Sequence, residues 1–152
     1  MALPNVFTAP VAQQLTERIN KLTAATQPVW GKMNVAQMLA HCNVTYELTY
    51  ENIHPRPNAF MRLILKSFVK KVVVGEKPYA KSIRTAPVFL VSSDKDFNRE
   101  KERLLNYIQK TLSTGEAAFE GKENHGFGKL TAQEWNNLFY KHLNHHLLQF
   151  GV

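Results

Sequence analysis

Three of the six histidines in this 152-residue chain lie within five positions near its end: His142, His145 and His146. On a helix, residues four positions apart lie about 40° apart around the axis, so His142 and His146 share one face. Helices of zinc proteases present two imidazoles to one metal ion at this spacing. His145 points about 100° away from His146. We therefore expect His145 to be a packing or surface residue, or one that supports the ligands.

A catalytic zinc site normally has three protein ligands and one open position, so a third donor is needed. A helix is predicted over residues 34–50, and His41 lies on its inward stripe with Met38 and Thr45. Cys42 is rotated about 100° from His41 and is predicted to be a small buried hydrophobe. The residues alone leave a second interpretation open, in which partly buried histidines bond only to backbone or carboxylate groups.

Four long helices must position these histidines. Hydrophobic periodicity and capping residues predict them at residues 8–22, 34–50, 93–112 or 96–112, and 131–150. Thr131 and Glu134 form a predicted capping box at the start of the last helix, and Gly151 ends it. The predicted fold class is therefore all-α: a four-helix bundle in a single domain, residues 1–152.

The predicted connection between the second and third long helices is long. It contains an extra short helix over residues 58–71, whose apolar face is predicted to comprise Phe60, Leu63, Ile64 and Phe68. Residues 75–92 then break the helical pattern, and residues 88–91 are predicted to be a short extended piece.

Composition restricts the class of protein. Cys42 is the only cysteine, so no intramolecular disulfide is possible, which fits a reducing compartment. The first five residues lack the features of a signal peptide, and no apolar run is long enough to span a bilayer. We expect a soluble cytoplasmic protein that makes no membrane contact.

The formal net charge is +7, from 19 Lys and Arg against 12 Asp and Glu. Basic residues cluster modestly, at Lys66, Lys70, Lys71, Lys77, Lys81 and Arg84. No recognised nucleic-acid-binding motif accompanies them, so we favour a solvated basic surface over a nucleic-acid interface.

The histidine motifs resemble those of a known superfamily. Residues 142–149 resemble the H-x-x-H-H-x-x-Q signature in the last helix of the DinB/YfiT-like superfamily. Residues 30–42 resemble the second-helix motif of one branch of small uncharacterised DinB-like proteins. That branch also shares the Gly-Lys-Leu-Thr lead-in at 128–131 and the Gln-Phe-Gly ending at 149–151. The resemblance extends from about residue 8 to residue 151.

The resemblance implies a four-helix bundle with a divalent metal bound by His41, His142 and His146. Imidazole ligands suit zinc, nickel or iron. It also implies a homodimer. Leu147 and Leu148 stand where many relatives have Arg-Gly, which weakens the transfer of any particular substrate or dimer contact.

The superfamily includes metal-dependent enzymes that use low-molecular-weight thiols. We therefore expect a metal-dependent enzyme that acts on a small molecule. Hydrolysis and transfer of a thiol sulfur both agree with the sequence. The alternative is a non-enzymatic small-molecule or stress-response binding protein whose metal is structural or anchors a ligand.

Several further residues carry expectations. His125, in a glycine-rich loop, could be a fourth ligand, a proton shuttle or a surface residue. Gln37 and Gln149 could line a pocket, bond a ligating imidazole or face solvent. His54 is predicted to be an exposed loop residue. Of the two tryptophans, we expect Trp30 to pack a loop onto the helices and Trp135 to be in the core.

Overall fold

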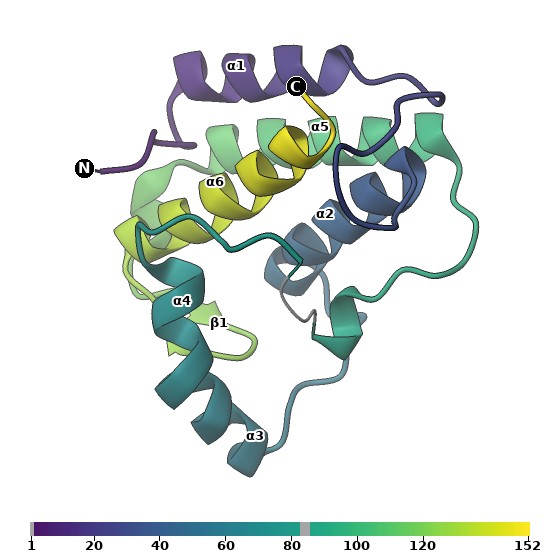
Figure 1. The fold of residues 1–152 in the computed structure, drawn as a ribbon. Coiled ribbons are helices and arrows are strands. Elements are labelled where there is room, and N and C mark those ends of the chain that lie inside the picture. Colours follow the sequence, from purple (N-terminus) through teal and green to yellow (C-terminus); the bar gives the residue numbers. More distant parts are fainter. Residues whose placement is uncertain (1, 83–85) are drawn as a thin grey trace.

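The computed structural model describes residues 2–82 and 86–152 and is mostly helical (Figure 1). Its long helices are α1 (Ala9–Asn20), α2 (Val35–Tyr50), α5 (Phe97–Thr114) and α6 (Ala132–Gln149). They agree to within a few residues with the four long helices expected from the sequence. Arg84, the last member of the basic cluster, lies outside the described residues.

The connection from α2 to α5 holds the helices α3 (Ala59–Ile64) and α4 (Lys70–Val74) and the π-helical turn η1 (Leu65–Val69) that joins them. A 3-10 turn, η2 (Pro87–Phe89), occupies the first two residues of the segment predicted to be extended, so the prediction is wrong for residues 88 and 89, whereas Leu90 has extended backbone angles. Proline at the first position of η2 restricts φ to a value compatible with a tight turn.

The all-α prediction also missed a small β-hairpin between α5 and α6. After the 3-10 turn η3 (Glu116–Phe119), strands β1 (Glu123–Asn124) and β2 (Gly128–Lys129) pair antiparallel. The Asn124 side chain closes the hairpin, because its Oδ1 accepts hydrogen bonds from two backbone amides of the turn, those of Gly126 and Phe127. Such a local polar contact leaves no hydrophobic periodicity in the sequence.

The predicted capping residues are found at α2 and α6, the two helices that carry the clustered histidines. Asn34 and Gln37 form a capping box at the start of α2, and Thr131 and Glu134 form one at the start of α6. Gly151, just beyond α6, has φ of 76°, a conformation that glycine adopts without steric cost. These caps determine where the two helices begin and end.

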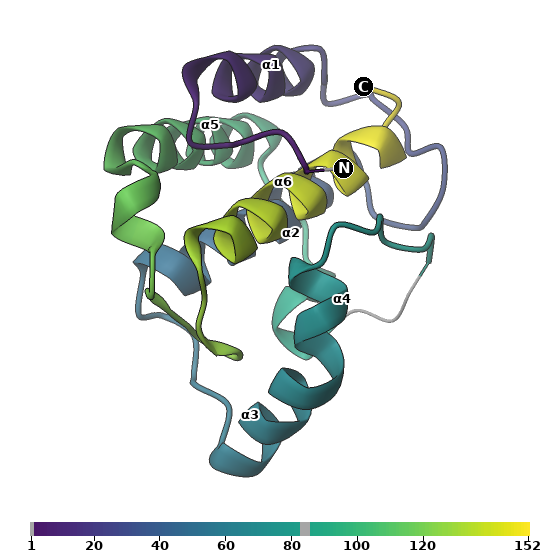
Figure 2. The same cartoon turned by 90° about the vertical axis from the view of Figure 1, so that its left-hand side faces the viewer.

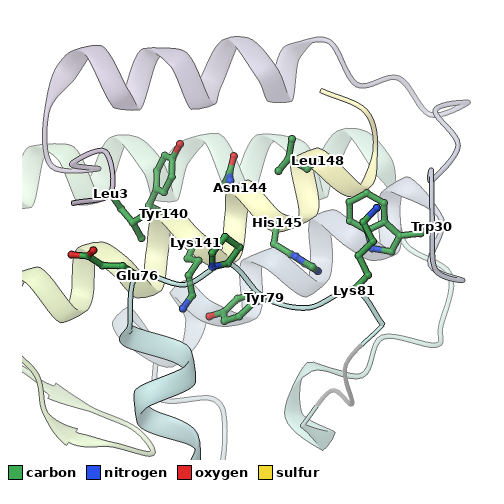
Figure 3. Close-up of a pocket in the computed structure, with 11 residues that line it drawn as sticks. Leu3, Trp30, Glu76, Tyr79, Lys81, Tyr140, Lys141, Asn144, His145 and Leu148 are labelled. Atoms are coloured by element: carbon green, nitrogen blue, oxygen red, sulfur yellow. The ribbon is translucent and has the colours of Figure 1, made fainter. Parts of the chain in front are cut away.

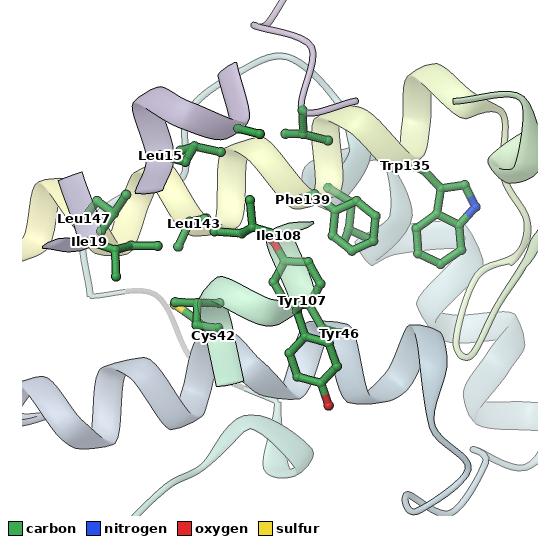
Figure 4. Close-up of a cluster of buried hydrophobic side chains, with 14 of the residues drawn as sticks. Leu15, Ile19, Cys42, Tyr46, Tyr107, Ile108, Trp135, Phe139, Leu143 and Leu147 are labelled. Carbon is green, nitrogen blue, oxygen red and sulfur yellow. The ribbon is translucent and has the colours of Figure 1, made fainter. Parts of the chain in front are cut away.

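The core lies among the four long helices. Helix α5 packs against α1 and α2, and α6 packs against α1, α2 and α4 (Figures 1 and 2). Tyr46 of α2 stacks between Tyr107 and Phe139, with ring centroids 5.3 and 5.0 Å away (Figure 4). Trp135 and Cys42 are buried in the same core, which confirms both predictions.

The segment α3–η1–α4, residues 59–74 and here called the arm, extends away from the long helices (Figures 1 and 2). Its predicted apolar face is wrong, because Phe60, Leu63 and Phe68 are 72%, 62% and 76% exposed. The residues that pack against the core are Leu65, Val69, Val73 and Val74. Only the α4 end of the arm lies against α6, and the π-helical turn rotates the residues beyond it relative to α-helical spacing.

Polar contacts from α6 hold the α4 end of the arm. Lys141 Nζ donates to the backbone oxygens of Val72 and Gly75 at 2.6 and 2.5 Å. Asn137 Nδ2 donates to the backbone oxygen of Val74 at 2.8 Å. These bonds satisfy carbonyls at the end of α4 that have no partner within the helix.

Candidate metal centre

Three imidazoles from two helices meet at the face that α2 and α6 share. The ligand atoms offered by His41, His142 and His146 all lie within 4.8 Å of one another. His41 and His146 are buried, and His142 is partly buried. In residues 2–82 and 86–152 this is the one group of three or more metal-ligating side chains with such spacing, and it includes no carboxylate.

The folding of α6 explains the placement of its two histidines. Trp135 and Phe139 are fully buried and stack on each other with ring centroids 5.5 Å apart. His142 and His146 continue the same line along the helix, as the sequence pattern predicts. His41 reaches them from α2, which is buried along most of its length.

Each of the three imidazoles has a separate hydrogen-bond partner at Nδ1. His41 Nδ1 donates to the Phe89 backbone oxygen at 2.8 Å, which fixes the proton on Nδ1 because a carbonyl only accepts. His146 Nδ1 lies 2.8 Å from Gln149 Oε1. Gln149 Nε2 donates to the Trp30 carbonyl at 2.8 Å, which turns its Oε1 toward His146. The Nε2 atoms of His41 and His146 therefore carry a lone pair rather than a proton.

The third imidazole, that of His142, bonds the Thr45 hydroxyl through Nδ1 at 3.1 Å. Its Nε2 lies 3.0 Å from His41 Nε2. Without metal, the Thr45 hydroxyl donates to Nδ1 and His142 donates its Nε2 proton to His41. If a metal ion were bound, the hydroxyl would accept from Nδ1 instead, and the Nε2 lone pairs of His41 and His142 would both be available to hold the ion. Thr45 can therefore support either tautomer of His142.

The spacing and donor type suit a divalent ion. Two nitrogens on a tetrahedral zinc ion, each at about 2.0–2.1 Å, are about 3.4 Å apart, close to the 3.0 Å between the His41 and His142 Nε2 atoms. The residues present therefore fit a metal ion held by three imidazoles.

Burial also keeps these side chains neutral. Desolvation lowers the pKa of His146 to about 3, with a further contribution from His41. The pKa of His142 is well below its usual value because of burial and the nearby His146 and His41. Burial likewise lowers the pKa of His41. Imidazoles bind metal in the neutral form, so at neutral pH no proton has to be removed from an imidazolium first.

The 3-10 turn η2 covers one side of the cluster. The Phe89 ring centroid lies 5.4 Å from that of His41 and 5.6 Å from that of His142. Sequence reasoning missed Phe89. Its neighbours in the structure, His41 and His142, are distant in the sequence, and no spacing rule connects them with it. Thr45 could have been proposed as a partner, since it lies four residues after His41 on the same stripe.

The other residues singled out from the sequence lie in different places. Gln149 bonds a clustered imidazole, whereas Gln37 accepts from the Asn34 amide in the capping box. Gln37 Nε2 also donates to the carbonyls of residues 92 and 93, at 3.4 and 3.5 Å. His125, in the β-hairpin, bonds the Pro55 carbonyl at 3.0 Å and is not part of the cluster.

The two remaining histidines also lie outside the cluster. His145 is partly buried, and the rings of Trp30 and Tyr79 lie edge-on to it at 5.9 and 5.6 Å. His54 lies in a loop, as predicted, but it is not exposed. His54 Nε2 donates to Glu47 Oε2 at 2.7 Å, and Glu47 also pairs with Arg103 of α5. This network holds His54 partly buried.

The fold and the cluster together define a mostly helical protein in which two long helices bring together three imidazoles that could hold a metal ion. A family model described as the DinB superfamily matches residues 7–150, nearly the whole chain. The chain therefore belongs to the DinB superfamily. Comparison with the curated proteins and with the solved structures returned no match. Within the described part of the chain, no helix has both the length and the apolar character needed to cross a membrane.

Proposed function

We propose that His41, His142 and His146 bind one divalent metal ion through their Nε2 atoms, and that the protein is a metal-dependent hydrolase or thiol S-transferase. One observation carries the proposal. A ligand atom from each of the three imidazoles lies within 4.8 Å of the others, and the Nε2 atoms of His41 and His142 are 3.0 Å apart, while every Nδ1 has another partner. Partners of this kind set the tautomer and orientation of ligating imidazoles. The proposed ion is zinc, nickel or iron.

The surrounding residues would serve this chemistry by orientation and by exclusion of water. Thr45, Gln149 and the Phe89 carbonyl hold the three rings, and the Phe89 side chain covers two of them. A divalent ion held by neutral imidazoles supplies an undiminished positive charge, which lowers the pKa of a water or thiol that it binds. A small thiol or a hydrolysable small molecule is the proposed substrate.

Metal analysis of the purified protein tests the proposed ligands. We expect about one equivalent of metal in the wild type and a loss of most of it in each of His41→Ala, His142→Ala and His146→Ala. His145→Ala is the matched control, because this adjacent histidine is outside the cluster, and it should retain metal. Unchanged metal content in all three ligand variants would overturn the proposal.

Turnover tests the enzymatic part. The metal-loaded protein would be offered small thiols with electrophiles, and separately a panel of esters and amides. Metal-dependent turnover in one panel, lost in His142→Ala, would select between S-transfer and hydrolysis. Failure with both panels would remove most of the support for an enzyme.

The second candidate is a non-enzymatic binding protein whose metal is structural or anchors a ligand. The burial of the imidazoles beneath Phe89 favours it, because a closed site has no position for a substrate. X-ray absorption spectroscopy and water-exchange measurements on the loaded protein separate the two. An exchangeable water ligand supports catalysis, and four protein ligands support the structural role.

Superfamily membership supports the further proposals that residues 1–152 form one domain of the four-helix-bundle type and that the protein assembles as a homodimer. We also propose a cytoplasmic location, which the presence of a single cysteine fits. Light scattering of the purified protein tests the oligomeric state, and a monomer at micromolar concentration would contradict the dimer.

A further inference from the structure

A cavity of about 150 Å³ lies beside α6, and none of the three clustered imidazoles lines it (Figure 3). Residues far apart in the chain line it, from the N-terminal segment, the loop before α2, the segment after α4, and α6. The side chains that matter here are Trp30, Tyr79, Lys81, Lys141 and His145. A protein cavity of about this size can hold a benzene ring.

The walls of the cavity suit a flat ring. His145 lies between the rings of Trp30 and Tyr79, and both present edge-to-face geometry to it. Leu148 and Tyr140 complete the apolar lining (Figure 3). Aromatic walls bind aromatic ligands through offset stacking and edge contacts.

Positive charge and an unused donor lie at the Trp30 end. Lys81 Nζ lies 4.4 Å from the centroid of the Trp30 ring, and the indole Nε1 of Trp30 is buried without a hydrogen-bond partner among the described residues. An unsatisfied buried N–H group is unfavourable, so an acceptor at this point would stabilise the site. The acidic lining residue, Glu76, lies at the opposite end, near Leu3 (Figure 3).

A second cation borders the same cavity. Lys141 Nζ lies 4.6 Å from the centroid of the Tyr79 ring, while it also donates to the carbonyls that end α4. The cavity therefore combines aromatic walls, two ammonium groups and one unsatisfied N–H donor. An acceptor with negative charge matches both the ammonium groups and the donor.

We propose that this cavity is a binding site for a monocyclic aromatic carboxylate. The ring would lie against Tyr79 and His145. The carboxylate would accept from the ammonium of Lys81. The indole N–H of Trp30 has no partner but also almost no accessible surface, so it would become a second donor only after Lys81 moves off the indole face. The site stands apart from the metal proposal, because none of its lining residues belongs to the imidazole cluster.

The site nevertheless contacts the cluster through one hydrogen-bond chain. The Trp30 carbonyl accepts from Gln149, and Gln149 Oε1 bonds His146. The ring centroids of His145 and His146 are 5.1 Å apart. A small molecule bound in the cavity would therefore lie near Gln149, the residue that orients the His146 imidazole, without touching His146 itself.

Calorimetry with benzoate tests the proposal on the full-length protein. We expect saturable binding, and binding of the neutral isostere benzamide that is weaker by about tenfold or more, because a charge-assisted pair is lost. Lys81→Gln and Trp30→Phe should each weaken benzoate binding several-fold while the fold is retained. Lys95→Gln, at an exposed lysine outside the cavity lining, is the matched control and should bind as the wild type does.

His142→Ala separates this site from the metal centre. Benzoate binding that persists in this variant, folded by circular dichroism, supports the cavity as the site, whatever happens to the metal. Binding lost only in His142→Ala would mean that benzoate binds at the cluster, which overturns the proposal. Absence of saturable binding at millimolar benzoate would also overturn the proposal. The same holds if benzamide binds as tightly as benzoate and Lys81→Gln leaves benzoate binding unchanged.

Discussion

Helix α6 and the arm differ in the side chains that they bury. Helix α6 buries several polar residues, namely Asn136, Asn137, Lys141, His146 and Gln149. The arm exposes its largest apolar residues, Phe60, Leu63 and Phe68. Each buried polar side chain on α6 has a partner; for example, Asn136 Oδ1 accepts from the Val6 amide at 2.8 Å. The contrast shows what decides whether a side chain is buried in this protein. The position of its helix and the hydrogen-bond partners within reach matter more than the polarity of the side chain.

The largest expected difference between the two regions is in the cost of deleting a phenylalanine. Phe139→Ala should lower the free energy of unfolding by about 3–5 kcal/mol, because the ring is 1% exposed and stacks in the core. Phe68→Ala, the matched change on the arm, should alter it by about 0.5 kcal/mol or less. Urea unfolding midpoints of the two variants provide the comparison. Similar losses in both would show that the arm is covered in solution.

The polar anchor of the arm should have the next largest effect. Lys141→Met keeps the apolar stem but leaves the Val72 and Gly75 carbonyls without their donor, at a cost of about 1–3 kcal/mol. The loss should be local. Amide hydrogen exchange should accelerate in α4 and remain unchanged in the α2–α5 core, and uniform acceleration would contradict the anchoring role.

A smaller and more specific effect is expected from the support of His146. Gln149→Ala should weaken metal binding by about 10–100-fold, because the imidazole loses the acceptor that fixes its tautomer. Competition with a chromophoric chelator measures the affinity. Gln27→Ala, at an exposed residue of the loop before α2, is the control. Equal affinities for Gln149→Ala and the wild type would remove Gln149 from the site.

A further stability effect concerns acid. The folded pKa of His146 is about 3, below the unfolded value of about 6.5, so the unfolded state binds the proton first as the pH falls. The metal-free protein should therefore lose about 1.4 kcal/mol of stability from His146 alone between pH 7.5 and 5.5, and more down to about pH 3. Denaturant unfolding of chelator-treated protein at both pH values tests this. In His146→Gln the pH dependence should be reduced by this amount.

The four long helices were predictable because their signals are local. Periodic apolar residues, the two capping boxes and Gly151 each act within a few positions of the chain. The pairing of His142 with His146 was predictable for the same reason, since helical geometry alone puts them on one face.

The exposure of the arm's apolar residues, the β-hairpin and the surroundings of His54 were not predictable, because each depends on partners distant in sequence or on a local polar contact. Phe60 and Phe68, eight positions apart, follow an apolar spacing typical of a buried face, yet both are largely exposed in the structure. His54 is held by Glu47, which belongs to a network that includes Arg103 from another helix.

The sequence by itself determined the helices, their caps and the face that carries two imidazoles, because these follow from interactions within a few residues. Only the tertiary structure decided that the Nε2 atoms of His41 and His142 lie 3.0 Å apart. It also brought the Phe89 carbonyl to His41 and the Trp30 carbonyl to Gln149. These contacts join residues 48 to 119 positions apart, and packing of the whole chain creates them, so no local pattern encodes them.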